Sequence, residues 1–181
     1  MRSIIAFLCL TVVLSLSASA FAADKENTLY IDLKDGRVVI EMRPDLAPKH
    51  VAQIKKLARA GKYDGVVFHR VIAGFMAQTG DPDGTGMGGM GDTLPAEFSK
   101  EPHVRGTVSM ARTSDPNSAR SQFFICFAPT PSLDGQYTVW GKVVSGMEFV
   151  DKIKKGAPGS GAVAPPQDKM IKVRVAADVK E

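Results

Sequence analysis

The chain has 181 residues, of which 44% are hydrophobic and 23% are charged, with a formal net charge of +4. This length allows one domain with a substantial core and is short for two domains. The lysines and arginines are scattered among acidic residues instead of forming the clustered basic stripe of a nucleic-acid surface, so we expect no nucleic-acid partner.

The N-terminal segment, residues 1–22, has the pattern of a secretory signal peptide. Arg2 precedes an apolar run that ends at Leu16, and small residues lead to a cleavage point after Ala22. The run is shorter than the about 20 residues that span a bilayer, which disfavours a transmembrane anchor. We therefore expect export to the periplasm and one soluble domain over residues 23–181, with no stable membrane insertion after cleavage.

The first elements of the expected domain are a hairpin and a helix. Two alternating runs over residues 28–42, joined by Asp35-Gly36, predict a β-hairpin. In residues 47–65, apolar side chains recur at helical spacing, Pro48 suits the first turn and Gly61 suits the end. This pattern predicts one amphipathic helix.

The rest of the chain is dominated by short strand-like runs. These runs cover residues 66–72, 106–112, 121–127, 137–144 and 170–179. A second helix is predicted to open at Ser145, whose pairing with Glu148 resembles a capping box, and residues 156–169 form a loop by composition. Many short strands, two short helices and no βαβ rhythm indicate a mainly β fold that is mostly antiparallel, either a sandwich or a closed barrel.

The usual catalytic and metal-binding patterns are missing from the sequence. His50, His69 and His103 lie far apart and belong to no HxH or HExxH pattern, so we expect no metal site and interpret each as a structural or surface histidine. No GxSxG nucleophile elbow is present. Cys126, the single cysteine after cleavage, lies in an apolar run and is predicted to be inert, without a disulfide.

A glycine-rich run, residues 84–89 (GTGMGG), has the spacing of a dinucleotide-binding fingerprint. With Asp81, Asp83 and Asp92 it also loosely resembles a calcium loop, although the glutamate of the twelfth position is absent. A dinucleotide fingerprint opens a helix, whereas Pro95 and further glycines follow here. A nucleotide-dependent enzyme and a calcium-stabilised loop are therefore the weakest alternatives.

The segment FHRVIAGFMAQTGD, residues 68–81, combines a cation, an amide and large apolar side chains. A strand here would place Phe68, Arg70 and Ile72 on one face, with the guanidinium among apolar groups. An arginine is rarely placed among apolar side chains without a purpose.

A second strand-like run, residues 121–127, has two different faces. Alternation places Phe123 and Ile125 on one face, which we assign to the core, and Gln122, Phe124 and Cys126 on the other. Because it carries a glutamine, the second face is expected to line a groove.

Four blocks of the sequence resemble the successive signatures of the cyclophilin family of peptidyl-prolyl cis/trans isomerases. They are FHRVIAGFMAQTGD, GTVSMAR, SQFFICFAPTPSLDG and VWGKVVSGMEFVDKI, in the family's order and over nearly the whole mature chain. The resemblance implies a closed eight-stranded antiparallel β-barrel capped by two α-helices, with a substrate groove on the outside. It implies rotamase activity on proline-containing, unfolded or flexible polypeptides by a monomer that needs no cofactor or metal.

The resemblance also assigns roles to individual residues. Arg70 takes the position of the family's catalytic residue. The proline pocket and the other substrate contacts fall on His69, Phe75, Met76, Gln78, Ala111, Arg112, Gln122, Phe124, Leu133 and Tyr137. The glycine run then becomes a rim of the peptide site, where the absence of side chains lets a substrate backbone approach closely.

The chemistry of bond rotation agrees with an arginine in this position. Rotation about a peptide bond has a barrier of about 18–20 kcal/mol because amide resonance must be broken. A guanidinium that donates a hydrogen bond to the prolyl nitrogen stabilises the twisted state more than the planar one. Such a bond contributes about 1.5–3 kcal/mol, so apolar and polar groups must also hold one side of the rotating bond.

Three positions depart from the best-known eukaryotic members of that family. Ser132 stands where many members have tryptophan, Tyr137 where they have histidine, and Arg112 where they have asparagine. We predict weak cyclosporin binding with isomerase activity retained, and an Arg112 side chain that biases the rim toward acidic substrates. A proline-peptide binding module or chaperone without turnover remains the alternative function, and the presence of Arg70 favours the enzyme.

Overall fold

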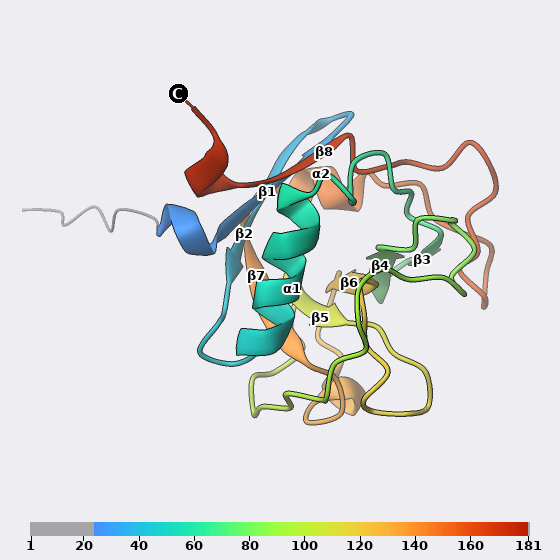
Figure 1. Ribbon diagram of the computed structural model, residues 1–181. Helices are drawn as coiled ribbons and strands as arrows, with labels where there is room; N and C mark the ends of the chain where they lie inside the picture. Colours follow the sequence, from blue (N-terminus) through green and yellow to red (C-terminus); the bar gives the residue numbers. More distant parts are fainter. Residues whose placement is uncertain (1–23, 181) are drawn as a thin grey trace, which may run out of the picture.

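Eight short strands form a single curled sheet in the computed structural model, which describes residues 24–180. All pairings are antiparallel and the spatial order is β3-β4-β6-β5-β7-β2-β1-β8. The strands are β1 (Thr28–Leu33), β2 (Gly36–Met42), β3 (Arg70–Ile72), β4 (Met76–Thr79), β5 (Thr107–Met110), β6 (Phe123–Cys126), β7 (Val139–Ser145) and β8 (Lys172–Val175). Figure 1 shows the sheet with helix α1 (Pro48–Arg59) packed beside it.

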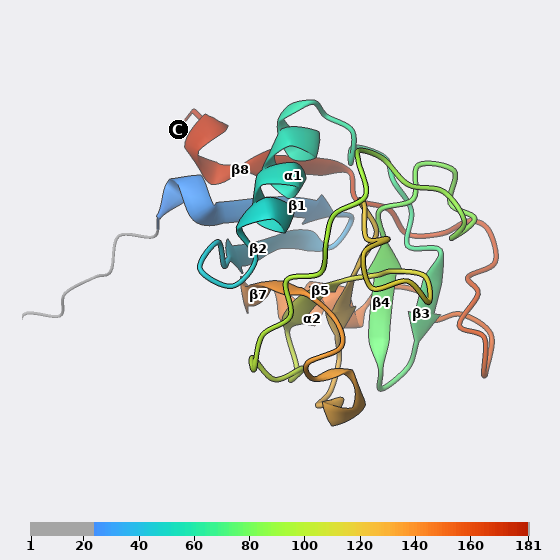
Figure 2. The ribbon, with the colours of Figure 1, turned by 60° about the horizontal axis from the view of Figure 1, so that its bottom comes forward.

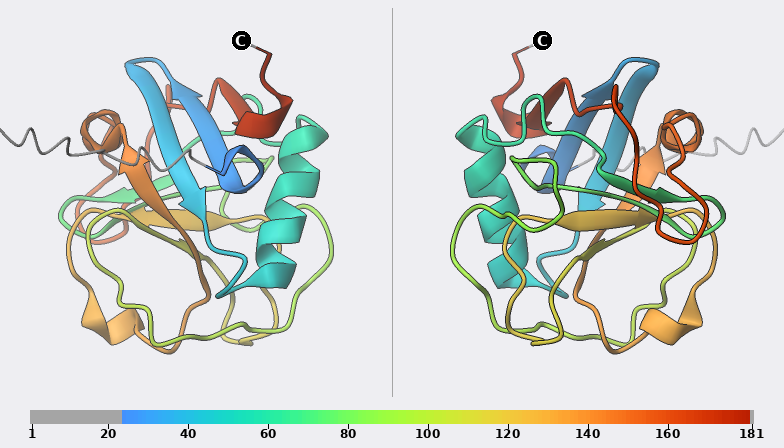
Figure 3. Two further views of the ribbon diagram at one scale, coloured as in Figure 1. Left: turned by 90° about the vertical axis from the view of Figure 1, so that its left-hand side faces the viewer. Right: turned by 90° about the vertical axis from the view of Figure 1, so that its right-hand side faces the viewer.

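The expected mainly β fold with two α-helices is confirmed, but "closed" overstates the barrel. The sheet ends at β3 on one side and β8 on the other, and within residues 24–180 these two strands do not pair with each other. The segment that precedes β8 lies along β3 and the residues before it, and isolated pairs join the two: Val67 with Lys169 and Arg70 with Ala162. Figure 3 shows the curled sheet from its two sides, with α1 along one of them.

The predicted signal peptide, residues 1–22, lies outside the described residues. Between residues 24 and 180, the helices lack the length and apolar character that a membrane crossing requires. Three short 3₁₀ helices complete the elements, at Lys25–Asn27, Pro131–Leu133 and Ala176–Asp178.

The predicted hairpin and first helix are both present. Leu33 pairs with Gly36, so the turn consists of Lys34 and Asp35 and lies one residue earlier than predicted. Gly36 is instead the first residue of β2, where a Cβ atom would overlap the ring of Phe149. Helix α1 begins at Pro48 as expected and buries the predicted apolar stripe.

The start of α1 is stabilised from outside the helix. Ala47 precedes it and provides no side-chain cap. The carboxylate of Glu97 instead accepts bonds from the backbone N–H groups of Lys49 and His50, each at 3.1 Å. It also lies 2.6 Å from Nδ1 of the buried His50 ring. These bonds satisfy amides that a helix start leaves open.

The capping box predicted at Ser145 is wrong. Ser145 is the last residue of β7, and helix α2 (Met147–Asp151) begins after Gly146. Gly146 has a φ of 84° and, lacking a side chain, cannot cap the helix. A Cβ atom at Gly146 would lie 2.3 Å from the carbonyl oxygen of Arg37. The close approach of β2 therefore selects glycine at this position, and it overrides the local capping pattern.

Strand β4 was not predicted from the sequence. Only the last three residues of the predicted run 66–72 form strand β3, and β4 follows it after a turn at Gly74, which has a φ of 73°. In β4, Met76, Ala77 and Thr79 are all buried, so the strand shows no alternation of polar and apolar residues. Figure 2 shows β3 and β4 side by side at one end of the sheet.

The core lies inside the curl of the sheet. Its centre contains Phe123, which makes edge-to-face contacts with Tyr63 and Trp140 at ring-centroid distances of 5.8 and 5.4 Å. Phe68 belongs to this core and is 1% exposed. Because Phe68 precedes β3 and its amide bonds to the carbonyl of Asp168, it does not share a face with Arg70, contrary to the prediction.

Candidate functional site

Strand β6 separates the core from a second apolar cluster on the outside of the sheet. Phe123 and Ile125 enter the core, whereas Phe124 and Cys126 join Met76 in the second cluster. The predicted division of this strand into a core face and a groove face is therefore confirmed. Partly buried residues surround the second cluster: Ile72, Phe75, Ala111, Leu133 and Tyr137.

A small pocket opens over this second cluster, and we call it the apolar pocket. Its volume is about 120 Å³. Its lining consists of Arg70, Phe75, Met76, Gln78, Ala111, Arg112, Phe124, Leu133 and Tyr137. All nine residues belong to the site predicted from the sequence, although they come from four separate stretches of the chain. The floor is apolar, and among the described residues that line the pocket the charged groups are two guanidiniums, those of Arg70 and Arg112.

His103 supports the floor of the apolar pocket from behind. Its buried ring stacks on Phe124 with centroids 6.2 Å apart and planes 20° apart. The ring Nδ1 and the backbone N–H of His103 lie 2.9 and 2.7 Å from one carboxylate oxygen of Asp134. These bonds hold the pKa of Asp134 below its usual range. His103 is thus structural, one of the two roles left open for it by the sequence, and its contact with the pocket gave no signal in the sequence.

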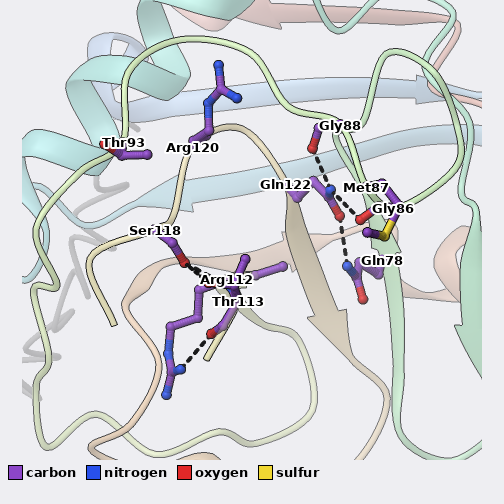
Figure 4. Close-up of a pocket in the computed structure, with 11 residues that line it drawn as sticks. Gln78, Gly86, Met87, Gly88, Thr93, Arg112, Thr113, Ser118, Arg120 and Gln122 are labelled. Atoms are coloured by element: carbon purple, nitrogen blue, oxygen red, sulfur yellow. Dashed lines mark hydrogen bonds between the residues drawn. The ribbon is translucent and has the colours of Figure 1, made fainter. Parts of the chain in front are cut away.

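Arg70 is connected to the neighbouring strands by a chain of side-chain amides. Its Nη1 donates to Oε1 of Gln78 at 3.2 Å, and Gln78 Nε2 donates to Oε1 of Gln122 at 2.9 Å. Gln122 Nε2 in turn donates to the carbonyl oxygens of Gly86 and Gly88, at 3.0 and 2.8 Å. Figure 4 shows this chain from Gln78 to Gly88. Each donor points the same way, which fixes the orientation of both amides.

The glycine loop, residues 84–89, is organised by a buried carboxylate. Asp81 Oδ2 accepts from the backbone N–H groups of Thr85, Gly86 and Gly88 and from the Thr85 hydroxyl, at 2.6–3.2 Å. Burial alone would raise the pKa of Asp81, but the backbone N–H of Asp83, which donates to Oδ1, and these donors together hold it below the usual value. Within residues 24–180 no cluster of three metal-ligating side chains exists. The carboxylate satisfies the loop's own amides instead.

A second, larger pocket adjoins the apolar pocket, and we call it the polar pocket. It encloses about 340 Å³ and shares Gln78, Ala111 and Arg112 with its neighbour. The glycine loop forms one wall, with Met87 almost fully exposed at the tip (Figure 4). The geometry agrees with the expectation that this loop borders the groove. The full lining is Gln78, Gly86, Met87, Gly88, Thr93, Ala111, Arg112, Thr113, Ser118, Arg120 and Gln122.

The Arg112 side chain turns back onto its own part of the chain. Its guanidinium donates to the carbonyl of Gln136 through Nε and Nη2, at 3.1 and 3.0 Å, and to the carbonyl of Thr113 at 2.8 Å. It also lies 4.5 Å from the centre of the Tyr137 ring. These bonds use the donors that a substrate carboxylate would need, so the geometry does not favour the predicted acidic bias.

His69 and Cys126 are both buried away from the open surface of the pockets. His69 lines neither pocket, and its ring lies where a Cβ atom on Gly86 would be 3.2 Å from its Cδ2. The substrate contact predicted for His69 therefore lacks geometric support. Burial raises the pKa of Cys126 to about 12, which keeps it a thiol and agrees with its predicted inertness.

Comparison with known proteins identifies the family. Residues 28–175 match the family model described as cyclophilin type peptidyl-prolyl cis-trans isomerase. The chain belongs to the cyclophilin family. This cyclophilin is 59% identical, over 184 aligned residues and 93% of each chain, to a probable peptidyl-prolyl cis-trans isomerase of Brucella suis. It is 46% identical to peptidyl-prolyl cis-trans isomerase B of Bacillus subtilis, over 72% of this chain and 92% of the relative.

Solved structures support the same assignment. A cyclophilin from Hirschia baltica has a TM-score of 0.77 to this cyclophilin at 29% identity, covering 87% of this chain and 77% of that one. A cyclophilin-type isomerase of Cryptosporidium parvum, solved in the presence of the dipeptide Ala-Pro, gives a TM-score of 0.75 at 29% identity, with 82% and 98% coverage. The protein is thus a cyclophilin-type peptidyl-prolyl cis-trans isomerase.

Proposed function

We propose that this cyclophilin accelerates rotation about X-Pro bonds in exported proteins as they fold, with Arg70 donating a hydrogen bond to the prolyl nitrogen. The observation that carries this mechanism is the position of Arg70 at the edge of the apolar pocket, where Gln78 orients its guanidinium. A proline ring on Phe124 would bring its nitrogen toward that edge.

The proposed chemistry needs no covalent step. As the bond twists, the nitrogen loses amide resonance and becomes a better hydrogen-bond acceptor, so a fixed donor stabilises the twisted state selectively. Arginine suits this role because it keeps its charge and presents its donors in a rigid plane. The apolar pocket would hold the ring, while Gln78 and Gln122 offer polar groups to the substrate backbone beside it.

A bound proline residue is supported by the Cryptosporidium parvum relative, which was solved in the presence of Ala-Pro. For the present chain we propose that proline enters the apolar pocket and that the preceding residues lie toward the polar pocket. The substrates would be unfolded or flexible segments, since a folded chain rarely leaves an X-Pro bond accessible on both sides. A monomer suffices because one chain supplies every group in this description.

We propose the cellular compartment and the affinity for cyclosporin from the sequence. The signal-like residues 1–22 support export to the periplasm, where chains fold after translocation. Ser132, which lies in the 3₁₀ helix beside Leu133, replaces a large ring with a small hydroxyl at the pocket edge and supports weak cyclosporin binding. A chaperone that binds proline peptides without turnover would use the same groove, but it would not need the oriented guanidinium of Arg70.

The test is an isomerisation assay on a short Ala-Pro peptide with the wild type and Arg70→Ala. We expect the variant to lose about 10- to 100-fold in kcat/KM, which corresponds to one charge-assisted hydrogen bond of about 1.5–3 kcal/mol. Arg59→Ala is the matched control. Arg59, the last residue of α1, donates hydrogen bonds to Asp178 and Glu26 and lies outside both pockets. An inactive wild type would refute catalysis, and a fully active, folded Arg70→Ala would refute the role of Arg70.

A further inference from the structure

A loop whose composition predicts no further role lies against the Arg70 side chain, which it contacts through a different nitrogen from Gln78. This segment, residues 156–163, runs along the outer edge of β3 (Figures 1 and 2). The backbone N–H of Val71 donates to the carbonyl of Gly161 at 2.7 Å, and the N–H of Gly156 donates to the carbonyl of Val71 at 2.8 Å. The segment is therefore attached to the strand that carries Arg70.

The same segment contacts the Arg70 side chain directly. Arg70 Nε donates to the carbonyl oxygen of Ser160 at 3.1 Å. A Cβ atom on Gly161 would lie 3.2 Å from Arg70 Cγ and 2.4 Å from Ile72 Cγ1, so the glycine backbone lies against the aliphatic stem of the arginine. A larger residue at 161 would have to displace one of these two side chains.

Two of the three guanidinium nitrogens of Arg70 thus donate hydrogen bonds within the protein, one to the 156–163 segment and one to β4. Ser160 accepts from Nε and Gln78 accepts from Nη1, while within residues 24–180 no group accepts from Nη2. A free arginine side chain loses about 2 kcal/mol of conformational freedom when it is fixed. Here that ordering is established before a substrate arrives, in an arginine that lines the apolar pocket.

We propose that the 156–163 segment positions the catalytic arginine, through the Ser160 carbonyl and the close packing of Gly161. Ser160 and Gly161 act through Arg70 and are not themselves in contact with substrate. This inference rests on the proposed role of Arg70, so its test must separate the two ideas. It must also separate positioning from a general contribution of the segment to folding.

The segment supplies its own matched control in Gly159. Gly159 and Gly161 both have a positive φ, 79° and 74°, so the backbone disfavours alanine at either position. A Cβ atom at Gly159 would meet nothing within 4 Å, whereas one at Gly161 would meet Arg70 and Ile72. A loss of activity that is confined to Gly161→Ala, and that disappears without Arg70, therefore reports the contact with the Arg70 side chain.

The experiment measures kcat and KM on the Ala-Pro peptide for Gly161→Ala and Gly159→Ala, each with Arg70 and with Arg70→Ala. We expect Gly161→Ala to lower kcat about 10- to 100-fold, as small misplacements of a catalytic group do, with KM changed less than about twofold. Gly159→Ala is expected to stay within about twofold of the wild type. In the Arg70→Ala background, Gly161→Ala should cause no further loss.

Several results would overturn the inference. Equal activities of the two glycine variants would overturn it. An equal loss of kcat from Gly161→Ala with and without Arg70 would also overturn it, because the loss would then reflect an effect on the fold. If Arg70→Ala alone is fully active, the failure lies with the proposed role of Arg70 and is recognised separately. Should Gly161→Ala not fold, hydrogen exchange of the Arg70 Nε–H in the wild type decides: exchange as fast as that of an unbonded guanidinium refutes the contact with Ser160.

Discussion

Replacing Asp81 by asparagine tests whether this buried carboxylate holds the glycine loop in place. Asp81 is fully buried, and its Oδ2 accepts four hydrogen bonds from Thr85, Gly86 and Gly88. Its Oδ1 accepts a fifth from the backbone N–H of Asp83 at 3.0 Å. Asparagine has the same shape but only one acceptor oxygen, so its NH₂ group must face at least one N–H group.

The magnitude follows from these five bonds. With the amide oxygen in the place of Oδ2, four bonds remain, but each falls from about 1.5–3 kcal/mol for a charged acceptor toward about 0.5–1.5 kcal/mol. The amide of Asp83 loses its partner, at about 1–3 kcal/mol. Burial of a neutral group is less costly than burial of a charge, which offsets part of the loss. We expect the loop to lose about 2–4 kcal/mol of local stability, or roughly 30- to 1000-fold in its closed population.

The assay is hydrogen exchange at the backbone amides of Gly86 and Gly88, because a loop can open without unfolding the whole chain. We expect protection of these amides to fall by that factor in Asp81→Asn. The kcat/KM should fall as well, since Gln122 bonds to the carbonyls of the same two glycines. Asp83→Asn is the matched control, because Asp83 is exposed directly before the loop and its carboxylate accepts no hydrogen bond from residues 24–180.

The pH dependence gives a second readout. Since the folded-state pKa of Asp81 is held below its usual value, its contribution is complete above the unfolded pKa of about 3.9 and is lost as the pH falls through the folded pKa. Wild-type protection should therefore decline in acid toward that of Asp81→Asn. Protection of Gly86 and Gly88 that is unchanged in the variant at pH 7, or an equal loss in Asp83→Asn, would refute the reasoning.

Three further predictions concern stability and drug binding. Glu97→Gln should lower the free energy of unfolding by about 1–2 kcal/mol at pH 7 in urea. Because bonds from His50 and Lys49 lower the pKa of Glu97 despite its burial, this difference should shrink in acid; a constant difference contradicts the assignment. Tyr63→Phe removes the buried bond to the Ser121 carbonyl and should cost about 1–3 kcal/mol in thermal unfolding with kcat/KM unchanged. Ser132→Trp should tighten cyclosporin binding at least about tenfold by calorimetry, and nanomolar binding to the wild type would contradict the prediction.

The parts of the fold that the sequence predicted are those that depend on local pattern. Helix α1 shows a clear apolar stripe between Pro48 and Gly61, and β6 separates its side chains into two faces by simple alternation. Strand β4 has no such pattern because its neighbours Met76 and Ala77, which point to opposite faces, are both buried. At Gly146 the close approach of the Arg37 carbonyl, more than a hundred residues away in the chain, decides where α2 begins.

The site was predictable in its lining and not in its supports. The pattern of polar groups in apolar runs predicted a groove at Phe124, Gln122 and Arg70, and resemblance to the cyclophilins assigned their roles. The groups that hold them gave no comparable signal. His103 meets Phe124 only in the folded chain, and the carbonyl of Ser160 is a backbone atom that any residue would supply. Contacts of this kind depend on the path of the chain and not on residue type.

The two-sided strand β6 has a consequence for how this protein can change. Phe123 is locked among aromatic rings in the interior, whereas its neighbour Phe124 lies on the floor of the apolar pocket. Adjacent positions along one strand therefore have separate roles, because one side chain stabilises the fold and the next contacts the ligand pocket. New specificities can be selected at Phe124 and at the adjoining Gln122 while the interior is left intact, so one short stretch gives the chain both a fixed interior and an adaptable surface.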